Sequence, residues 1–523
     1  MGSRPRAALL AAPLLIALSG RAAAQDTTAT TPPPSAAIPV PPPIEPLVEL
    51  QASPLLAEDH WAVRAANRAE ALGLAPTYFP AQRAVPRHVV ARALAEAAHN
   101  AEGRPGLEKL TAGWWARFRS EFPETEGIPN AGLVRLGGFA AAGVEGVEGR
   151  LSPRHSPPDD PEAYPLAPEP LPDRTLPFAA ADLALAVAPH LAVELQPEVT
   201  SRAVAMPAWD AIVGFGRVSL AAGEGPVTYG WERAGGVIFA DPRPMPRVEV
   251  QTTAPVRLPL RFLGSLSAHA FVSRLDEPRH PGDPWLWGMR LALRPQRRFT
   301  LALTRGAMFG GNVSPVTADR LVKSFFGALR QHFDNQILSA DVRWRVPTET
   351  FMPLTAYLEW AADDGAGAAD EQPAILGGFT IPAVPGAPML SVGAEYAHVA
   401  ECCSHGSWYI HSEFGGEWAR RGRPLGHPLG GGGHEARVYA DADLPGELTL
   451  SADAFARERG TDSFDPITPG NLFAPTRSGA SHGASAQLQW RFLPAAELRA
   501  RAAREQGSAW HEQSFQVSLR YLF

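Results

Sequence analysis

The sequence predicts an all-β transmembrane outer-membrane β-barrel of about 18 antiparallel strands with a small N-terminal periplasmic α-helical bundle. Three observations carry this prediction. From residue 131 to the end, apolar and polar residues alternate along segments of about ten residues. Short connections between these segments alternate with long loops rich in Gly, Pro and Asp. The chain also ends on a regular alternating strand whose last residue, Phe523, is aromatic.

The N-terminus has the pattern of a secretory signal peptide. Arg4 and Arg6 precede an apolar stretch that is too short for a stable membrane anchor, and Ala22 and Ala24 offer a cleavage site. We therefore expect residues 1–24 to be removed as the protein is exported. An uncleaved anchor is the alternative.

Two regions separate the signal from the barrel. Residues 25–50 are rich in proline and are expected to form an extended linker. Residues 51–126 are expected to form a periplasmic helical bundle, because apolar residues recur there at helical spacing. The three helical segments contain Trp61, Ala65, Ala69 and Leu72; Val89, Ala93 and Ala97; and Leu107, Leu110, Trp114 and Phe118. A bundle this small is close to the lower size limit for independent stability, so we expect it to pack under or into the barrel.

Residues 131–523 are assigned to the barrel. One hairpin shows the alternation clearly, with Leu448, Leu450, Ala452 and Ala454 set against Thr449, Ser451 and Asp453. The expected short turns are 295–297, 348–353, 383–387, 445–446 and 494–497, and the expected long loops are 309–334, 361–373, 401–434 and 460–483. The strand count is weakest between Ala221 and Arg261. A soluble two-layer β-protein is the alternative.

The last strand presents one apolar face, formed by Phe515, Val517, Leu519, Tyr521 and Phe523. A soluble chain end usually frays, whereas a closed barrel has no free edge. We therefore expect this strand to pair with the first barrel strand and to turn these five side chains towards outer-membrane lipid. The same alternation and the terminal aromatic residue are typical of the signal that outer-membrane assembly machinery recognises.

The polar faces of the strands carry many charges. Those expected to point inward are Arg290, Arg294, Arg343, Arg345, Arg437, Arg457, Arg491, Arg499, Arg501 and Arg520, together with Asp341, Glu359, Asp441 and Asp453. We interpret them as ladders of opposite charge that fill a closed interior. A path or site for acidic sugars is the alternative.

Other kinds of chemistry find little support. The net charge of −7 argues against a nucleic-acid partner. Cys402 and Cys403 are adjacent, and adjacent cysteines cannot easily face one metal ion together. Ser481 belongs to a G-x-S-x-G pattern but lies between a loop and a strand, where a nucleophile elbow cannot form. We predict no catalytic residues, no metal site and no cofactor.

Five short blocks carry a resemblance to a known family. They are DPRPMPRVEVQ (241–251), WLWGMRLALRP (285–295), LTRGAMFGG (303–311), NQILSADVRWRVP (335–347) and RGRPLGHPLGG (421–431). In their order and approximate spacing, the chain resembles the capsule-assembly Wzi family over roughly residues 52–523. The resemblance implies an outer-membrane lectin with an 18-stranded barrel and a periplasmic helical bundle, which helps to hold capsular polysaccharide on the cell surface. The stretch VTYGWERAGG (227–236) departs from the Trp-Gly-rich sequence expected before the first block.

On this basis we expect a non-enzymatic outer-membrane barrel that binds capsular or extracellular polysaccharide. Carbohydrate sites need aromatic platforms with hydrogen-bonding neighbours, and the loop at 401–434 offers Trp408, Tyr409, His411, Glu413 and Trp418. A packed lid without ligand is the alternative for this loop. The alternatives for the whole protein are a porin-like channel, which needs an open lumen, and a barrel enzyme.

Overall fold

The structure is a computed structural model of the chain. It describes residues 47–129, 134–148, 174–200, 204–231, 233–275, 282–311, 315–326, 334–349, 351–363, 373–399, 401–402, 406–411, 416–420, 423–430, 432–459, 479–508 and 511–523. Residues 46–523 form one compact unit. The expected signal peptide, residues 1–24, lies outside the described residues.

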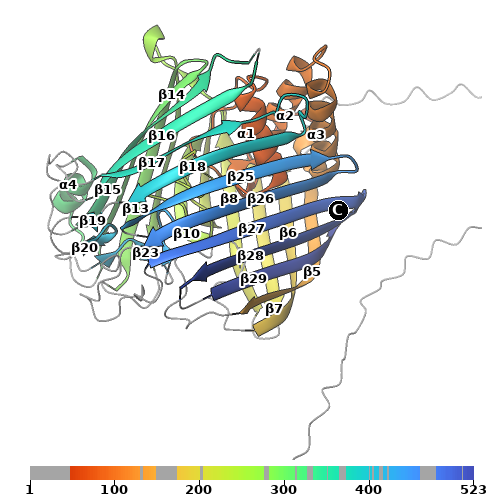
Figure 1. Ribbon diagram of the computed structural model, residues 1–523. Coiled ribbons are helices and arrows are strands. Elements are labelled where there is room, and N and C mark those ends of the chain that lie inside the picture. The colour runs from red at the N-terminus through yellow and green to blue at the C-terminus, as the bar shows by residue number, and fades with distance from the viewer. Residues whose placement is uncertain are drawn as a thin grey trace, which may run out of the picture. The chain divides into compact units, whose positions relative to one another are not determined.

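The central feature is a closed antiparallel barrel (Figure 1). Its described strands are β5 (Arg135–Glu148), β6 (Arg174–Ala188), β7 (Leu191–Thr200), β8 (Val204–Phe215), β9 (Val218–Gly225), β10 (Met245–Thr252), β11 (Val256–Arg257), β12 (Ser265–Arg274), β13 (Pro284–Gln296), β14 (Phe299–Gly310), β15 (Asp334–Val346), β16 (Leu354–Asp363), β17 (Ala374–Ile381), β18 (Leu390–Val399), β25 (Gly433–Leu444), β26 (Leu448–Arg459), β27 (Gly479–Leu493), β28 (Ala496–Gly507) and β29 (His511–Leu522). Because β10 and β11 both pair with β12, they form one interrupted strand, and the nineteen labelled strands make an 18-stranded barrel. The prediction of about 18 strands is therefore confirmed, and the interruption falls where the count was weakest.

The two ends of the barrel differ. Each expected short turn joins two neighbouring strands at one end, which we call the turn end, and the expected long loops leave from the opposite end, the loop end. The loop end carries α4 (Ala318–Phe326) and the two-residue strands β19 (Glu401–Cys402), β20 (Gly406–Ser407), β21 (Ile410–His411), β22 (Gly416–Glu417), β23 (Ala419–Arg420) and β24 (Arg423–Pro424). In Figure 1, α4 lies at the end opposite the bundle.

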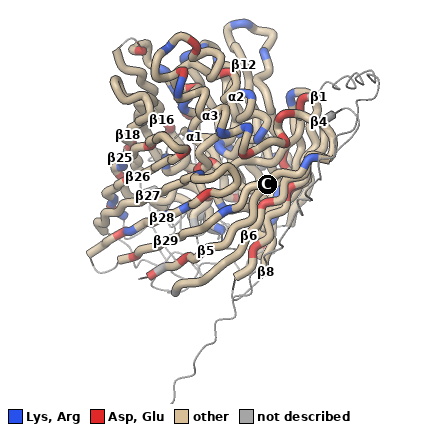
Figure 2. The backbone as a smooth tube through the Cα atoms, turned by 90° about the vertical axis from the view of Figure 1, so that its right-hand side faces the viewer, with Lys and Arg blue, Asp and Glu red and all other residues tan. Residues whose placement is uncertain are grey.

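The last strand closes the barrel. β29 lies between β28 and β5, and its pairing with β5 runs from Gln513↔Glu148 to Leu522↔Phe139 (Figure 2). The five side chains predicted to face lipid are all exposed on the outer wall: Phe515, Val517, Leu519, Tyr521 and Phe523. The prediction of a closing strand with an apolar outer face is confirmed.

A charge on this outer face should block assembly. Val517 is 42% exposed on the outer wall near the middle of β29, between Ala500 and Val144. Val517→Arg should lower the stability of the inserted barrel by about 2–4 kcal/mol, because the guanidinium would enter the lipid expected against this face. We expect the variant to be lost from the outer-membrane fraction and to show no heat-modifiable gel shift.

The neighbouring inward position supplies the control. The Gln516 Nε2 donates a hydrogen bond of 3.2 Å to Glu145 Oε2 inside the barrel, so an arginine there gains a carboxylate partner. Gln516→Arg should assemble normally. Equal behaviour of Val517→Arg and Gln516→Arg would contradict the inward–outward assignment of β29.

Three helices pack together at the turn end. They are α1 (Trp61–Ala71), α2 (Arg87–Asn100) and α3 (Leu107–Glu121), and the short elements beside them are β1 (Leu47–Val48), β2 (Leu55–Leu56), β3 (Val85–Pro86), η1 (Pro123–Glu126) and β4 (Ile128–Pro129). The residues predicted from the helical spacing form much of the shared core, including Trp61, Ala69, Val89, Trp114 and Phe118. None of the described helices is long and apolar enough to cross a membrane.

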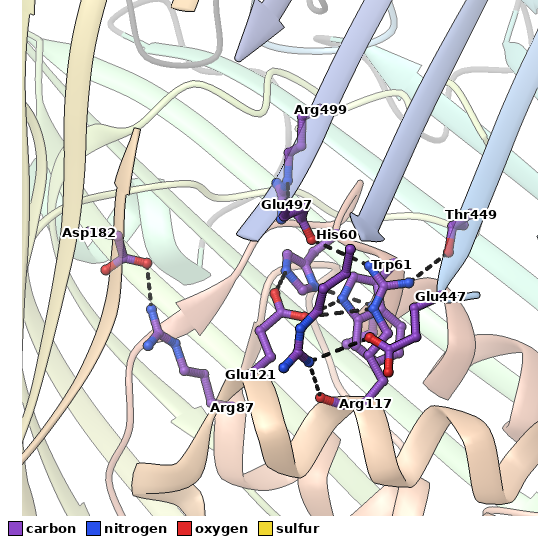
Figure 3. Close-up of polar contacts among 12 residues, drawn as sticks. His60, Trp61, Arg87, Arg117, Glu121, Asp182, Glu447, Thr449, Glu497 and Arg499 are labelled. Atoms are coloured by element: carbon purple, nitrogen blue, oxygen red, sulfur yellow. Dashed lines mark hydrogen bonds and ion pairs between the residues drawn. The ribbon is translucent and has the colours of Figure 1, made fainter. Parts of the chain in front are cut away.

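Buried charges fasten the bundle to the inner wall of the barrel (Figure 3). Arg87 of α2 lies within 3.0 Å of Glu124, 2.7 Å of Asp182 on β6 and 2.9 Å of Glu194 on β7. Arg117 of α3 lies 3.3 Å from Glu497 on β28. These contacts hold the bundle inside the turn end, which agrees with the expectation that it packs under or into the barrel.

Further pairs join the bundle to the arginines predicted to point inward. Glu70 of α1 pairs with Arg294 and Arg343, and Arg501 pairs with Asp59. Across the wall itself, Arg290 pairs with Asp341 at 2.6 Å. The interpretation of these residues as internal charge ladders is confirmed for these pairs, and many of the arginines also serve as anchors for the bundle.

Candidate functional site

Two chain segments fold into the barrel at the loop end, and we call them together the lid. The first is residues 226–244, between β9 and β10, and the second is residues 406–430, between β18 and β25, as far as each is described. Their apolar side chains share one buried cluster with inward residues of the wall: Val227, Tyr229, Val237, Ile238, Phe239, Trp408, Tyr409, Trp418, Leu425 and Leu429 from the lid. The lid therefore has a hydrophobic core of its own.

The structure corrects the prediction that the loop aromatics form an open platform. Trp408, Tyr409 and Trp418 are 1%, 2% and 0% exposed, so their rings have no free face for a sugar. They pack the core of the lid, as the alternative for this loop expected. The loop sequence has no regular alternation of apolar and polar residues, so it gives no sign of which aromatic side chains are buried.

The remaining two predicted residues lie in a hairpin. His411 pairs with Gly416 through the β21–β22 backbone, and residues 412–415 connect these strands. The backbone of His411 therefore flanks the connection, whereas its side chain and the whole of Glu413 lie outside the described residues. The buried aromatics stand immediately before and after this hairpin in the sequence, where they fix its base.

Hydrogen bonds connect the two lid segments. The Trp418 Nε1 donates to the Ile238 carbonyl at 2.7 Å, and the Tyr409 hydroxyl donates to the Val237 carbonyl at 2.5 Å. Burial raises the pKa of Tyr409 above its usual range, so the hydroxyl keeps its proton and remains a donor. The segments also approach too closely for a side chain at Gly426, whose Cβ would lie 2.0 Å from the Val237 carbonyl oxygen.

Carboxylates of the inner wall hold the first lid segment by its backbone. Glu395 on β18 accepts a hydrogen bond of 2.7 Å from the Arg233 amide, and Glu359 on β16 accepts one of 3.2 Å from the Val237 amide. Asp341 on β15 accepts a hydrogen bond of 2.6 Å from Trp231 Nε1. Asp341 and Glu359, which the alternation placed inside the barrel, and Glu395, which the sequence analysis did not single out, therefore satisfy loop donors that would otherwise be buried without partners.

The second lid segment is held in the same way. Asp363 accepts a hydrogen bond of 2.9 Å from the amide of Tyr409, whose backbone is left-handed with a φ of 76°. Such a φ is uncommon for a residue with a side chain, and here several contacts impose it. Burial lowers the pKa of His427 to about 4, which leaves the ring neutral near pH 7, and its Nδ1 accepts a hydrogen bond of 3.2 Å from the Leu429 amide.

Sequence reasoning missed the first lid segment as a functional element. The signal that could have found it is the loss of period-two alternation after Gly225, where Pro and Gly replace the strand pattern up to Pro244. This is also the stretch, residues 227–236, in which the sequence departs from the resembled family. The departure lies inside the barrel, where Tyr229 donates to or accepts from His269 Nδ1 at 2.7 Å.

The bundle and the lid meet inside the barrel, and residues of both line a cavity there. The Arg83 guanidinium from the bundle donates to the Arg233 carbonyl in the lid at 3.2 Å. The cavity has a volume of about 390 Å³, and charged or hydroxyl side chains such as Asp59, Arg64, Asp441 and Ser451 line it. Within the described part of the chain, the lumen is thus occupied from both ends rather than open along its length.

Of the residues considered for catalysis or metal binding, those that the structure describes are not assembled into a site. Ser481 lies within β27, where its Oγ donates to Glu505 Oε1 at 2.6 Å, and no helix follows it. The described residues contain no group of three His, Cys, Asp or Glu side chains placed to hold a metal ion. Cys403 lies outside the described residues, as does the side chain of Cys402.

Comparisons with known proteins agree with this architecture. The family model described as capsule assembly protein Wzi matches residues 192–514, which is more than half of the chain. The solved structure of Escherichia coli Wzi, described as an outer-membrane protein involved in group 1 capsule assembly and as a carbohydrate-binding β-barrel, superposes with a TM-score of 0.68. It is 15% identical over 90% of this chain and 99% of that chain, a likeness that shows the same fold.

Two Pseudomonas aeruginosa structures are more distant. OccK11 (OpdR) has a TM-score of 0.43 and 12% identity over 75% of this chain and 96% of that chain. OpdQ has a TM-score of 0.42 and 10% identity over 74% of this chain and 98% of that chain. A search of curated proteins found no match. With the extent of the family match and the plugged 18-stranded barrel, this chain belongs to the capsule assembly protein Wzi family of outer-membrane barrels.

Proposed function

We propose that the protein is a non-enzymatic, lectin-like barrel of the outer membrane that binds capsular or extracellular polysaccharide at the cell surface. The observation that carries this proposal is the lumen of the described structure, which the bundle occupies from the turn end and the lid from the loop end. A barrel filled in this way offers a binding surface rather than a passage. Membership of the Wzi family and the carbohydrate binding described for the Escherichia coli protein support the same conclusion.

The polysaccharide contact is proposed for the hairpin around residues 411–416. The buried aromatics Trp408, Tyr409 and Trp418 act as its support, because they are committed to the lid core. His411 and Glu413 are proposed as the hydrogen-bonding groups, since imidazole and carboxylate groups can pair with sugar hydroxyls and both residues stand between the buried aromatics in the sequence. Burial of the aromatics on both sides restricts the chain that enters and leaves the hairpin, and a restricted segment loses less conformational entropy on binding.

Substitution of these two polar residues tests the contact. The double variant His411→Ala, Glu413→Ala should fold normally and lose about tenfold in affinity for the polysaccharide, which corresponds to one or two lost hydrogen bonds. The measurement is surface polysaccharide retained by cells that carry the variant as their sole copy, with binding by the purified protein. The matched control is His434→Ala, Glu458→Ala, a His–Glu pair exposed on the outer wall at the loop end. Equal retention by both double variants would overturn the assignment of the hairpin.

Electrical conductance separates this function from a porin-like channel. We expect no steady conductance from the full-length protein in planar bilayers, because side chains of the bundle and the lid meet inside the barrel. A porin of this strand number needs a water-filled constriction that stays open. Large and steady channel openings would contradict the proposed function and favour the channel.

The route to the membrane belongs to the same proposal. Residues 1–24 are proposed as a cleaved signal peptide, residues 25–50 as a periplasmic linker, residues 51–126 as the periplasmic bundle and residues 131–523 as the membrane barrel. The outer face of β29, from Phe515 to Phe523, is proposed as the signal for the assembly machinery, and outer-membrane lipid is the proposed neighbour of the wall. The closure of the barrel by β29 supports this role.

A further inference from the structure

The outer wall of β26 to β29 carries a shallow groove with an unusual floor. In one row across the strands, Ala452 pairs with Ala486, Ala486 with Ala502, and Ala502 with Phe515. All four side chains are exposed on the outside of the barrel. The groove over this row has a volume of about 940 Å³ and is mostly apolar. Its floor is alanine where much of the wall between β12 and β17 exposes Trp, Leu, Val and Phe.

The polarity of the groove changes sharply at the next row towards the loop end. There Ala484 pairs with Arg504, Arg504 with Gln513, and Gln513 with Glu148. This row is two residues further along the strands, which is about 7 Å. On the other side of the alanine floor, towards the turn end, the wall stays apolar with Leu450, Leu488, Ala500 and Val517. The Arg504 row therefore marks the loop-end boundary of the apolar band.

Arg504 is the cation at this boundary, and its guanidinium makes few interactions with the described part of the protein. Its side chain is exposed, and its hydrogen bond to Gln506 Oε1 is long, at 3.5 Å. Within the described chain no carboxylate pairs with it within 4 Å; Glu148, two strands away in the same row, accepts from Gln513 Nε2. A guanidinium at the edge of an apolar groove matches a phosphate, with which it can form two parallel hydrogen bonds.

We propose that this groove is a specific site for a phosphate-bearing lipid of the outer leaflet. The acyl chain lies over Ala452, Ala486 and Ala502 against the ring of Phe515, and the phosphate pairs with Arg504. The small side chains of the floor leave room for the chain, and the height of Arg504 at the edge of the apolar band is where lipid headgroups begin. Glu148 lies in the same row as Arg504, two strands away on β5. Its negative charge repels an anionic headgroup placed over β5, so the headgroup is oriented towards Arg504.

The test uses the full-length protein, purified in neutral detergent, stripped of lipid and examined by native mass spectrometry. The probes are phosphatidylglycerol, a diacylglycerol with the same chains, and inorganic phosphate. We expect a one-to-one adduct with phosphatidylglycerol at about tenfold lower concentration than with diacylglycerol, and none with inorganic phosphate alone. Arg504→Gln should abolish this preference, and Ala486→Trp, which fills the groove, should weaken both lipid adducts.

A matched arginine supplies the control. Arg274 is also exposed at the loop end of the wall, but it pairs with Asp283 at 3.2 Å, so Arg274→Gln should leave the lipid preference unchanged. Equal binding of the two lipids, or an unchanged preference in Arg504→Gln, would overturn the proposal. A dimer that forms without lipid and disappears in Ala486→Trp would also overturn it and assign the alanine floor to contact with a second copy. A heat-modifiable gel shift confirms folding of each variant, and polysaccharide retention is measured separately, so failure here leaves the proposed function untouched.

Discussion

Arg87→Ala should release the helical bundle from the barrel wall. The guanidinium is 1% exposed and pairs with three carboxylates, those of Glu124, Asp182 and Glu194, at 3.0, 2.7 and 2.9 Å. Burial disfavours its charged form, but the three carboxylates outweigh burial and hold the pKa of Arg87 above its usual range. Removing it leaves buried negative charges without a partner, which costs about 3–5 kcal/mol.

Hydrogen exchange of the α2 amides in detergent would measure this loss while the barrel serves as the internal reference. The control is Arg92→Ala on the same helix, whose ion pair with Glu49 is long, at 3.6 Å, and partly solvent-exposed. That variant should change stability by less than about 1 kcal/mol. Adding Asp182→Asn to Arg87→Ala should recover part of the loss, because one unpaired charge is removed. Equal exchange in the two arginine variants would show that the buried cluster does not hold the bundle.

Trp418→Ala should loosen the lid. The indole is fully buried, packs at a tilt against Phe239 with ring centroids 5.4 Å apart, and donates to the Ile238 carbonyl at 2.7 Å. Its removal leaves a cavity and a carbonyl without its donor, and a substitution of this kind costs about 3–5 kcal/mol. The two lid segments should then separate more often, while the bundle still closes the turn end.

The lid amides report this change directly. The Leu425 amide donates to the Trp418 carbonyl, and the Ala240 amide donates to the Leu425 carbonyl. Their hydrogen exchange should accelerate at least about 100-fold in Trp418→Ala. Trp490→Ala is the matched control, because Trp490 lies on the outer wall and is 42% exposed, so the lid should exchange as in the unchanged protein. Slow lid exchange in both variants would argue that Trp418 is not central to the lid.

Sequence alone determined the elements whose pattern is local. Alternation with a period of two depends only on neighbouring residues, so it located the strands, the short turns and the outward face of β29. The helical period did the same for the bundle, and Trp61, Ala69 and Phe118 lie in its core as expected. The inward arginines could also be assigned, because an inward position follows from the parity of the strand.

Only the tertiary structure shows which charges of the helical bundle pair with which charges of the barrel wall. Arg87 meets Asp182 and Glu194, which stand 95 and 107 positions away in the chain. No sequence period connects residues at such distances, so the anchoring of the bundle could not be derived from spacing. The closed form of the barrel places β6 and β7 opposite α2, and the low dielectric of the interior then makes the pairing of these charges obligatory.

The same reason explains the correction at the lid. Trp408, Tyr409 and Trp418 have the composition of a carbohydrate platform, and composition cannot say which face of a loop is covered. Their burial depends on a second segment that the chain reaches 180 positions away, where Ile238 accepts the hydrogen bond of Trp418. Local sequence determined which segments form the strands of the barrel wall. Long-range packing inside the closed barrel decided which aromatic side chains remain available to a ligand.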